Sequence, residues 1–244
     1  MLSPRTSCCS VIELRQYTTQ PGQLDRLVEL FDREFVETQE ALGMHIVGQF
    51  RDRDRPDMFV WIRGFPDMGT RGTALSAFYG GPVWAQHRDA ANATMLDSDN
   101  VLLLRPAFPD AGLSHQRLDR PAPDAGSSAG SVIEVTVCPL TTPASKDLLV
   151  HLRHEAVPAL QDAAGGPVAC YVTEPAENNF PALPVRADDN VLVWITRADS
   201  TSGTHDAPVL GPAMESDVLP ALGEHLAGSP ETMRLSPTPR SQLR

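Results

Sequence analysis

The sequence predicts an α+β fold made of two tandem copies of one strand–helix–strand–strand–helix–strand unit, whose antiparallel sheets pack face to face as a barrel. The first observation is a repeat, since the stretch Val11 to Tyr17 (VIELRQY) recurs 121 positions later as Val132 to Cys138 (VIEVTVC). The second is that the same order of apolar patterns follows each copy. The third is residues 108–130, whose Pro, Ala, Gly and Ser content is typical of a linker.

Six elements are expected in the first unit. Val11 to Tyr17 alternates as a strand does, and the apolar residues from Leu24 to Leu42 recur at helical steps up to Gly43, a residue that favours a left-handed C-cap. The charged run 51–57 contains Pro56 and predicts a solvated hairpin loop rather than an anion-binding Arg cluster, because its acids cancel its arginines. The remaining elements are strands at 44–51, 58–64 and 101–105 and helices at 66–78 and 83–96.

The second unit repeats this order with changes. A helix capped by Thr142 is expected to begin at Pro143. Gly211-Pro212 corresponds to Gly81-Pro82 and precedes the second helix. The Pro-rich insertion 174–190 lengthens the second hairpin. Strands are expected at 132–138, 168–173, 191–196 and 233–235. The predicted organisation is a first domain at 8–107, a linker at 108–130, a second, diverged domain at 131–236 and a tail at 237–244.

Composition and charge exclude several classes of protein. The chain of 244 residues has room for two domains of about 100 to 120 residues, and its 41% hydrophobic content is ordinary for a globular protein. The formal net charge of −11 repels nucleic acid and anionic membranes, and no apolar run reaches the roughly 20 residues of a membrane span. The first ten residues do not read as a secretory signal, which predicts a cytoplasmic location.

Both units leave one sheet face to be covered. The face that carries Tyr17, Phe59 and Trp61 would be a large exposed apolar patch if it stayed open. A second sheet can cover it, so we expect Trp61 and its counterpart Trp194 to line the space enclosed by the barrel. A monomer that acts as a pseudo-dimer and a homodimer both satisfy this requirement.

Several motifs of the first unit together resemble the NIPSNAP family of dimeric α/β-barrel proteins. They are Glu13-Leu14-Arg15-x-Tyr17, Pro21-Gly22, the segment 43–48, Trp61, Pro82-x-Trp84 and Leu104-Arg105-Pro106. The resemblance covers most of residues 10–107 and is weaker over 131–236, where Thr136 and Cys138 replace the Arg and Tyr. It implies a ferredoxin-like barrel, a fold that hosts cofactor-independent monooxygenases, small-molecule cyclases, haem enzymes and plain ligand binders.

The candidate catalytic residues come mainly from the first strand. Glu13, Arg15 and Tyr17 alternate onto one face, and Arg63 joins them from the third strand. One interpretation is a structural ion pair; the other is a carboxylate with a raised pKa that acts as a general base beside an arginine that binds an anionic oxygen. The candidate substrate-binding residues are Phe59, Trp61, Arg63, Trp84 and Trp194.

Histidines supply the other candidates. His87 follows Trp84 by three residues on the predicted helix after Gly80-Gly81-Pro82, so it is either a hydrogen-bonded structural residue or a proton shuttle. His45 is a weaker candidate for an inward-facing position. The run 151–155 (HLRHE) lacks the spacing of a zinc helix and is better explained as an exposed helix face. The four cysteines also lack a zinc or disulfide pattern, so neither a metal nor a cofactor is expected.

Two functions remain open from the sequence. The first is a cofactor-independent enzyme, a cyclase, isomerase or monooxygenase, that acts by acid–base chemistry on a small aromatic or polyketide-like molecule of biosynthesis inside the barrel. The second is a non-catalytic protein that binds a small molecule or another protein. A cavity of several hundred cubic ångströms between the sheets, lined by the polar row, would favour the enzyme.

Overall fold

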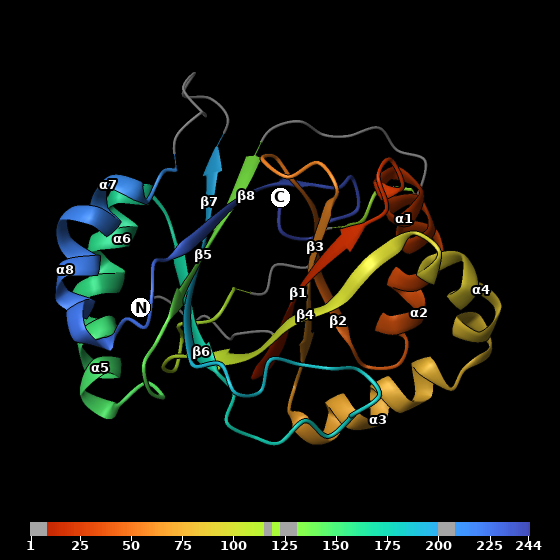
Figure 1. The fold of residues 1–244 in the computed structure, drawn as a ribbon, viewed down its shortest axis with the longest axis horizontal. Coiled ribbons are helices and arrows are strands. Elements are labelled where there is room, and N and C mark those ends of the chain that lie inside the picture. The colour runs from red at the N-terminus through yellow and green to blue at the C-terminus, as the bar shows by residue number, and fades with distance from the viewer. Residues whose placement is uncertain (1–8, 115–118, 123–130, 200–207) are drawn as a thin grey trace.

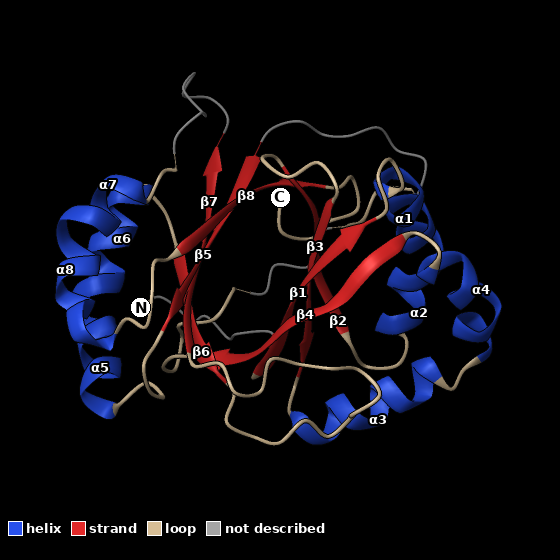
Figure 2. Ribbon diagram, in the orientation of Figure 1, coloured by secondary structure: helices blue, strands red, loops and turns tan. Residues whose placement is uncertain are grey.

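The computed structural model describes residues 9–114, 119–122, 131–199 and 208–244. Within them, eight strands close into one antiparallel barrel, and the two sets of helices lie on opposite sides of it (Figure 1, Figure 2). The predicted fold class is therefore confirmed. The strands are β1 Val11–Thr19, β2 His45–Asp52, β3 Met58–Phe65, β4 Met95–Pro106, β5 Ser131–Pro139, β6 Val168–Thr173, β7 Val191–Asp199 and β8 Glu231–Pro237.

The strand order shows two copies of one unit. Around the barrel the order is β1-β3-β2-β8-β5-β7-β6-β4, so each half keeps its fourth, first, third and second strands side by side. The halves join where β2 pairs with β8 and β4 pairs with β6. The barrel thus closes within one chain.

The helices of the first half are α1 Leu24–Leu30, α2 Val36–Glu40, α3 Met68–Tyr79 and α4 Pro82–Asn92, and those of the second are α5 Lys146–His151, α6 Val157–Ala164, α7 Gly211–Ala213 and α8 Leu219–Leu222. A π-helical turn separates α1 from α2 at Phe31–Phe35, and another separates α5 from α6 at Leu152–Ala156. These two turns are 121 positions apart, as the first strands of the repeat are. The backbone irregularity belongs to the repeated unit.

The core has three layers. Aliphatic side chains from all eight strands fill the barrel, among them Ile12, Leu14, Ile62, Ile133 and Ile195. A second cluster lies between the barrel and helices α1 to α4, and a third lies between the barrel and α5 to α8.

This layering corrects the predicted faces. Phe59, Trp61 and Tyr17 belong to the cluster beneath α1 to α4, and Trp194 belongs to the cluster beneath the helices of the second half. None of them lines the barrel interior. An eight-stranded barrel is only wide enough to be filled by side chains, so it takes the aliphatic face of each strand. The bulky aromatic and charged face packs under helices instead.

Two local predictions change and a third is confirmed. α4 ends at Asn92 and β4 begins at Met95, so the expected helix 83–96 is too long. α5 is capped by Ser145, whose side chain accepts a hydrogen bond from the backbone N–H of Leu148, and not by Thr142. Gly43 does adopt the expected left-handed conformation, with φ of 88°.

The predicted linker lies only partly within the described residues, at 108–114 and 119–122. The predicted tail is packed in place, because Thr238, Arg240 and Ser241 are buried and Leu243 N–H bonds to the Val47 carbonyl. None of the helices in the described part of the chain has the length and hydropathy of a bilayer-spanning segment.

Candidate functional site

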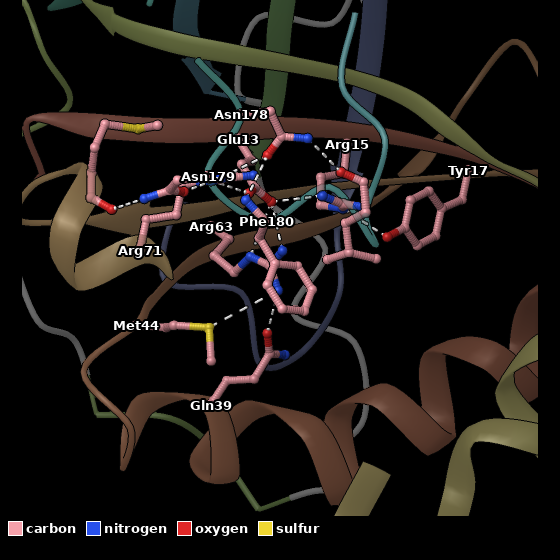
Figure 3. Close-up of polar contacts among 12 residues, drawn as sticks. Glu13, Arg15, Tyr17, Gln39, Met44, Arg63, Arg71, Asn178, Asn179 and Phe180 are labelled. Carbon is pink, nitrogen blue, oxygen red and sulfur yellow. Dashed lines mark hydrogen bonds and ion pairs between the residues drawn. The ribbon is translucent and has the colours of Figure 1, made fainter. Parts of the chain in front are cut away.

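A buried ion cluster lies on the outer face of the first half, beneath its helices (Figure 3). The register of β1 and β3 sets Glu13 opposite Arg63, and Arg15 follows two residues along β1. Arg15 Nη1 and Arg63 Nη2 each lie 2.6 Å from Glu13 Oε2. Arg71, from the first turns of α3, places its Nε 2.7 Å from the other carboxylate oxygen. One carboxylate therefore accepts hydrogen bonds from three guanidinium groups.

The cluster carries excess positive charge. The side chains of Glu13, Arg63 and Arg71 are 0% exposed and that of Arg15 is 1% exposed. Among the described residues, Glu13 is the one carboxylate in contact with these three arginines, which leaves a net charge of +2. Burying unbalanced charge is costly unless further partners are present.

The pKa values reflect this imbalance. Burial would raise the pKa of Glu13, but the charges of Arg63, Arg15 and Arg71 outweigh it and hold that pKa well below its usual range. Burial lowers the pKa of Arg71, as do the like charges of Arg63 and Arg15, whereas Glu13 raises it. Of the two interpretations, the carboxylate with a raised pKa is therefore contradicted, whereas ion pairs of Glu13 with Arg15 and Arg63 are present. Glu13 is permanently ionised and is a poor general base.

Neighbouring side chains hold the arginines in place. Gln39 Oε1 accepts from Arg63 Nη1 at 2.9 Å, and Gln39 Nε2 is fixed in turn by the carbonyl of Phe35. The guanidinium groups of Arg63 and Arg15 lie over the Trp61 ring, with Cζ at 5.0 and 5.5 Å from the ring centroid. These contacts make the donors rigid, which suits recognition of a fixed anion.

Two buried nitrogens at this cluster have no hydrogen-bond partner among the described residues. They are Arg71 Nη2 and Trp61 Nε1. Buried donors are nearly always satisfied in folded proteins, so the unused guanidinium nitrogen leaves this cluster of excess positive charge one acceptor short.

Tyr17 extends the polar row to its edge. Arg15 Nε donates to the Tyr17 hydroxyl at 2.7 Å, and the Tyr17 side chain is 7% exposed. Burial raises the pKa of Tyr17 despite the opposing charges of Arg15 and Arg63. The phenol is thus neutral at physiological pH and can donate a proton.

A loop of the second half covers the cluster. Asn178 Oδ1 and Asn179 Oδ1 accept from Arg71 Nη1 at 3.0 and 2.7 Å (Figure 3). Phe180 stacks on Tyr79 with ring centroids 5.7 Å apart. Tyr79 itself lies 6.0 Å from the Arg63 guanidinium. The candidate site is therefore built from both halves.

Comparison with known proteins assigns the first half to a family. Residues 12–108 match the sequence model of the NIPSNAP family. We call this part of the chain the NIPSNAP domain, after the family that it matches. No curated protein sequence matches the chain.

Solved structures support the fold of the whole chain. A candidate monooxygenase from Fusobacterium nucleatum aligns with a TM-score of 0.55 at 9% identity, covering 93% of this chain and 92% of its own. A candidate monooxygenase from Lactobacillus acidophilus gives the same score and identity, with 95% and 96% covered. A NIPSNAP family protein from Agrobacterium tumefaciens covers 39% of this chain and 84% of its own, at 16% identity and a TM-score of 0.37. The first two likenesses concern the fold alone.

The NIPSNAP domain places the other predicted residues apart from the ion cluster. Trp84 and His87 lie on one side of α4, as expected, and both contact Phe35, at 5.7 and 6.3 Å between ring centroids. His87 Nε2 lies 3.5 Å from Glu34. His87 therefore contacts side chains of the neighbouring helical segment, and none of these contacts is with Glu13. Trp194 lies in the second half.

Sequence reasoning missed Arg71, Gln39 and the two asparagines. Arg71 sits in a segment that the apolar pattern identified only as a helix, and Asn178 lies in an insertion of the other half. The predicted pairing of two sheets gave no reason to bring either to Glu13. The one available signal was the spacing of Arg71, which lies on the same helical stripe as the apolar residues Ala74, Leu75 and Phe78 of α3.

The structure also shows where the run 151–155, the candidate metal motif, lies. His154 and Glu155 are exposed at the π-helical turn after α5, and His151 Nδ1 lies 3.4 Å from Glu155. Within the described residues no group of three or more His, Cys, Asp or Glu side chains is arranged to hold a metal ion.

A cavity of about 300 Å³ lies outside the barrel, between its β4, β6 and β7 edge and the loop that follows β6. Its lining includes Leu103, Arg105, Val172, Glu174 and Arg186. It contains none of the predicted site residues, so it is not the cavity expected between the sheets.

Proposed function

We propose that the NIPSNAP domain binds a small aromatic molecule that carries an anionic oxygen, such as a carboxylate, phenolate or enolate. The observation that carries the proposal is the buried net charge of +2 at Glu13, Arg15, Arg63 and Arg71, with Arg71 Nη2 unpaired among the described residues. A bound anion reduces the unbalanced charge and supplies the missing acceptor.

The aromatic part of the ligand is inferred from the aromatic side chains that surround the arginines. Trp61, Tyr79 and Tyr17 lie beside the arginines, and Phe180 already stacks on Tyr79. Flat aromatic surfaces around a few fixed polar groups are typical of small-molecule sites. The ligand lies between the sheet and the helices, because aliphatic side chains fill the barrel.

The experiment compares a charged probe with its neutral analogue. Isothermal titration with 2-naphthoate and 2-naphthamide is expected to show at least about tenfold tighter binding of the carboxylate, the weight of one charge-assisted hydrogen bond. Arg71→Met is expected to remove that preference. Arg53→Met, which removes an exposed arginine from the hairpin loop, is the control that keeps it. Equal binding of the two probes, or an unchanged preference in Arg71→Met, would contradict the proposal.

A cofactor-independent enzyme is the second candidate, favoured by the Arg15–Tyr17 hydrogen bond of 2.7 Å. A water molecule would take the carbon-bound proton, the arginines would stabilise the resulting enolate, and the neutral Tyr17 phenol would return a proton to carbon and then recover one from solvent. Oxygenation of the enolate would need O₂ as the oxidant. The candidate monooxygenases that share the fold make this class worth testing.

The test is proton exchange in a diketone probe. With benzoylacetone in D₂O, an enzyme of this kind would accelerate exchange of the carbon-bound protons, which NMR follows directly. Tyr17→Phe is expected to lose most of that acceleration while retaining 2-naphthoate binding. If Tyr17→Phe exchanges as fast as the unmodified protein, or neither accelerates exchange, the chain acts as a binding protein only.

A further inference from the structure

The loop between β6 and β7 is unusual for its length. Residues 174–190 contain no helix or strand, whereas the matching loop of the NIPSNAP domain spans only 53–57. Loops of this length without regular structure are uncommon in small domains and are often functional. Figure 1 shows the loop crossing from the second half to run beside α3.

Both ends of the loop are anchored to β4. The backbone N–H of Glu174 bonds to the Leu103 carbonyl and that of Arg186 bonds to the Val101 carbonyl, each at 2.9 Å. The stretch between these anchors, residues 176–183, reaches the ion cluster. It can therefore leave α3 without unpairing the barrel.

This stretch packs Phe180 and Leu183 against the apolar cluster beneath α1 to α4, and its hydrogen bonds to the ion cluster all go to Arg71. Asn178 and Asn179 both accept from the same nitrogen of Arg71, and Asn179 also donates to the Met68 carbonyl. Asn179 lies against Gly72, where an added Cβ would be 2.8 Å from its Nδ2. Gly72 is what lets the loop approach α3 so closely.

This stretch alone lies between solvent and the Arg71 side chain at Asn179. Asn179 is exposed on its outer side, while the Arg71 side chain directly beneath it is 0% exposed. Displacing this stretch is therefore enough to bring solvent, or a solute, to the cluster.

We infer that residues 176–183 of the second half are a displaceable lid that occupies the ligand site of the NIPSNAP domain in this structure. The amide oxygens of Asn178 and Asn179 stand where the ligand's anionic oxygen binds Arg71, and the Phe180 ring stands where its aromatic ring stacks on Tyr79. The identity of the ligand rests on the proposed function, whereas the lid itself does not.

The lid predicts which arginines a reagent can reach. Phenylglyoxal modifies accessible guanidinium groups, and peptide mass spectrometry gives a separate rate for each arginine. In the unmodified full chain, Arg71 is expected to react at least about tenfold more slowly than the exposed Arg53, in keeping with a site that opens only transiently.

Two variants open the lid by different means. Asn178→Ala/Asn179→Ala removes its hydrogen bonds to Arg71, and Gly72→Ala forces Asn179 away while favouring the helix in which it lies. Both are expected to raise the reaction rate of Arg71 about tenfold relative to Arg53. Gly166→Ala, where an added Cβ meets nothing within 4 Å, is the control that leaves the ratio unchanged.

Two results would overturn the lid. One is Arg71 reacting as fast as Arg53 in the unmodified chain, which means the cluster is already open. The other is an unchanged Arg71 rate in both variants while circular dichroism shows a folded chain. Since the reagent needs no ligand, a failed 2-naphthoate titration with a raised Arg71 rate rejects the proposed ligand and keeps the lid.

Discussion

Glu13 and Glu134 occupy the same position in the two repeats but are held by opposite kinds of partner. Three guanidinium groups surround the Glu13 carboxylate, whereas Glu134 accepts hydrogen bonds from the backbone N–H groups of Val209 and Leu210 at 2.6 and 3.0 Å. Burial raises the pKa of Glu134 against those hydrogen bonds, while Glu13 is kept strongly acidic. The same position of the repeat thus holds a carboxylate in an ion cluster in one half and a carboxylate that binds loop N–H groups in the other.

Glu13→Gln is expected to lower the free energy of unfolding by about 3–5 kcal/mol, because it leaves three buried guanidinium groups without a counter-charge. Guanidinium chloride denaturation followed by circular dichroism measures the change. Glu134→Gln is the matched control, and it is expected to cost no more than about 1 kcal/mol because an amide oxygen still accepts from a backbone N–H. Equal costs at the two positions would refute the ion cluster as the source of the difference.

Arg71→Met is expected to change the free energy of unfolding by less than about 1 kcal/mol. Glu13 keeps its bonds to Arg15 and Arg63, and removing the third guanidinium reduces like-charge repulsion in the cluster. Arg63→Met is the comparison, and it is expected to lower the free energy of unfolding by more. Arg63 donates two hydrogen bonds to Glu13 Oε2 and a third to Gln39. Denaturation of both variants decides the point, since a larger loss in Arg71→Met would mean that Arg71 is structural rather than a ligand-binding residue.

The architecture could be predicted from the sequence because the repeat and the alternation survive in it. The recurrence of Val11–Tyr17 predicts two equivalent first strands, and the structure gives β1 and β5 equivalent places in the two halves of the barrel. The faces could not be predicted in the same way. Alternation separates Leu14 from Glu13, yet both faces of β1 are buried, so nothing in the pattern says which one enters the barrel.

The candidate site was predictable only where its residues lie on neighbouring strands. Glu13, Arg15 and Arg63 follow from strand alternation and from the order of β1 and β3. Asn178 is 107 positions from Arg71, and its contact depends on the path of a loop without regular structure. Sequence spacing carries no information about such a contact, nor about the approach of Arg71 to Glu13, whose positive charge helps to lower the pKa of that carboxyl.

Gly64→Ala is expected to destabilise the fold by about 1–3 kcal/mol through overpacking. A Cβ at Gly64 would lie 2.2 Å from Cys9 Sγ and 2.8 Å from Cys9 Cβ, where the N-terminal segment packs against the core of the barrel. Thermal denaturation measures the loss. Cys9→Gly in the same chain removes both clashing atoms and should make the added methyl group nearly neutral, so a double variant as unstable as the sum of the two single changes would show that the clash is not the cause.

Asp32 gives the fold a pH dependence that can be isolated. Burial raises the pKa of Asp32 to about 6, against the lowering effect of Arg240 and Arg120, and its carboxylate accepts from Gln49 Nε2 at 3.2 Å. Because this pKa is higher in the folded chain than the ordinary value of 3.8, folding favours the protonated form. The contribution of Asp32 to stability is therefore most favourable below about pH 4 and is lost as the pH rises through about 6.

Asp32→Asn keeps an uncharged acceptor at this position at every pH. Relative to the unmodified chain it is expected to be about 1–2 kcal/mol more stable at pH 8, with the difference closing by about pH 4. Denaturation midpoints across that range measure the difference curve. Asp25→Asn, which changes a carboxylate that is 88% exposed, is the control for loss of a surface charge. A difference curve for Asp32→Asn that is flat between pH 4 and 8 would mean that Asp32 titrates as an ordinary carboxylate and that the C-terminal tail around Arg240 does not desolvate it.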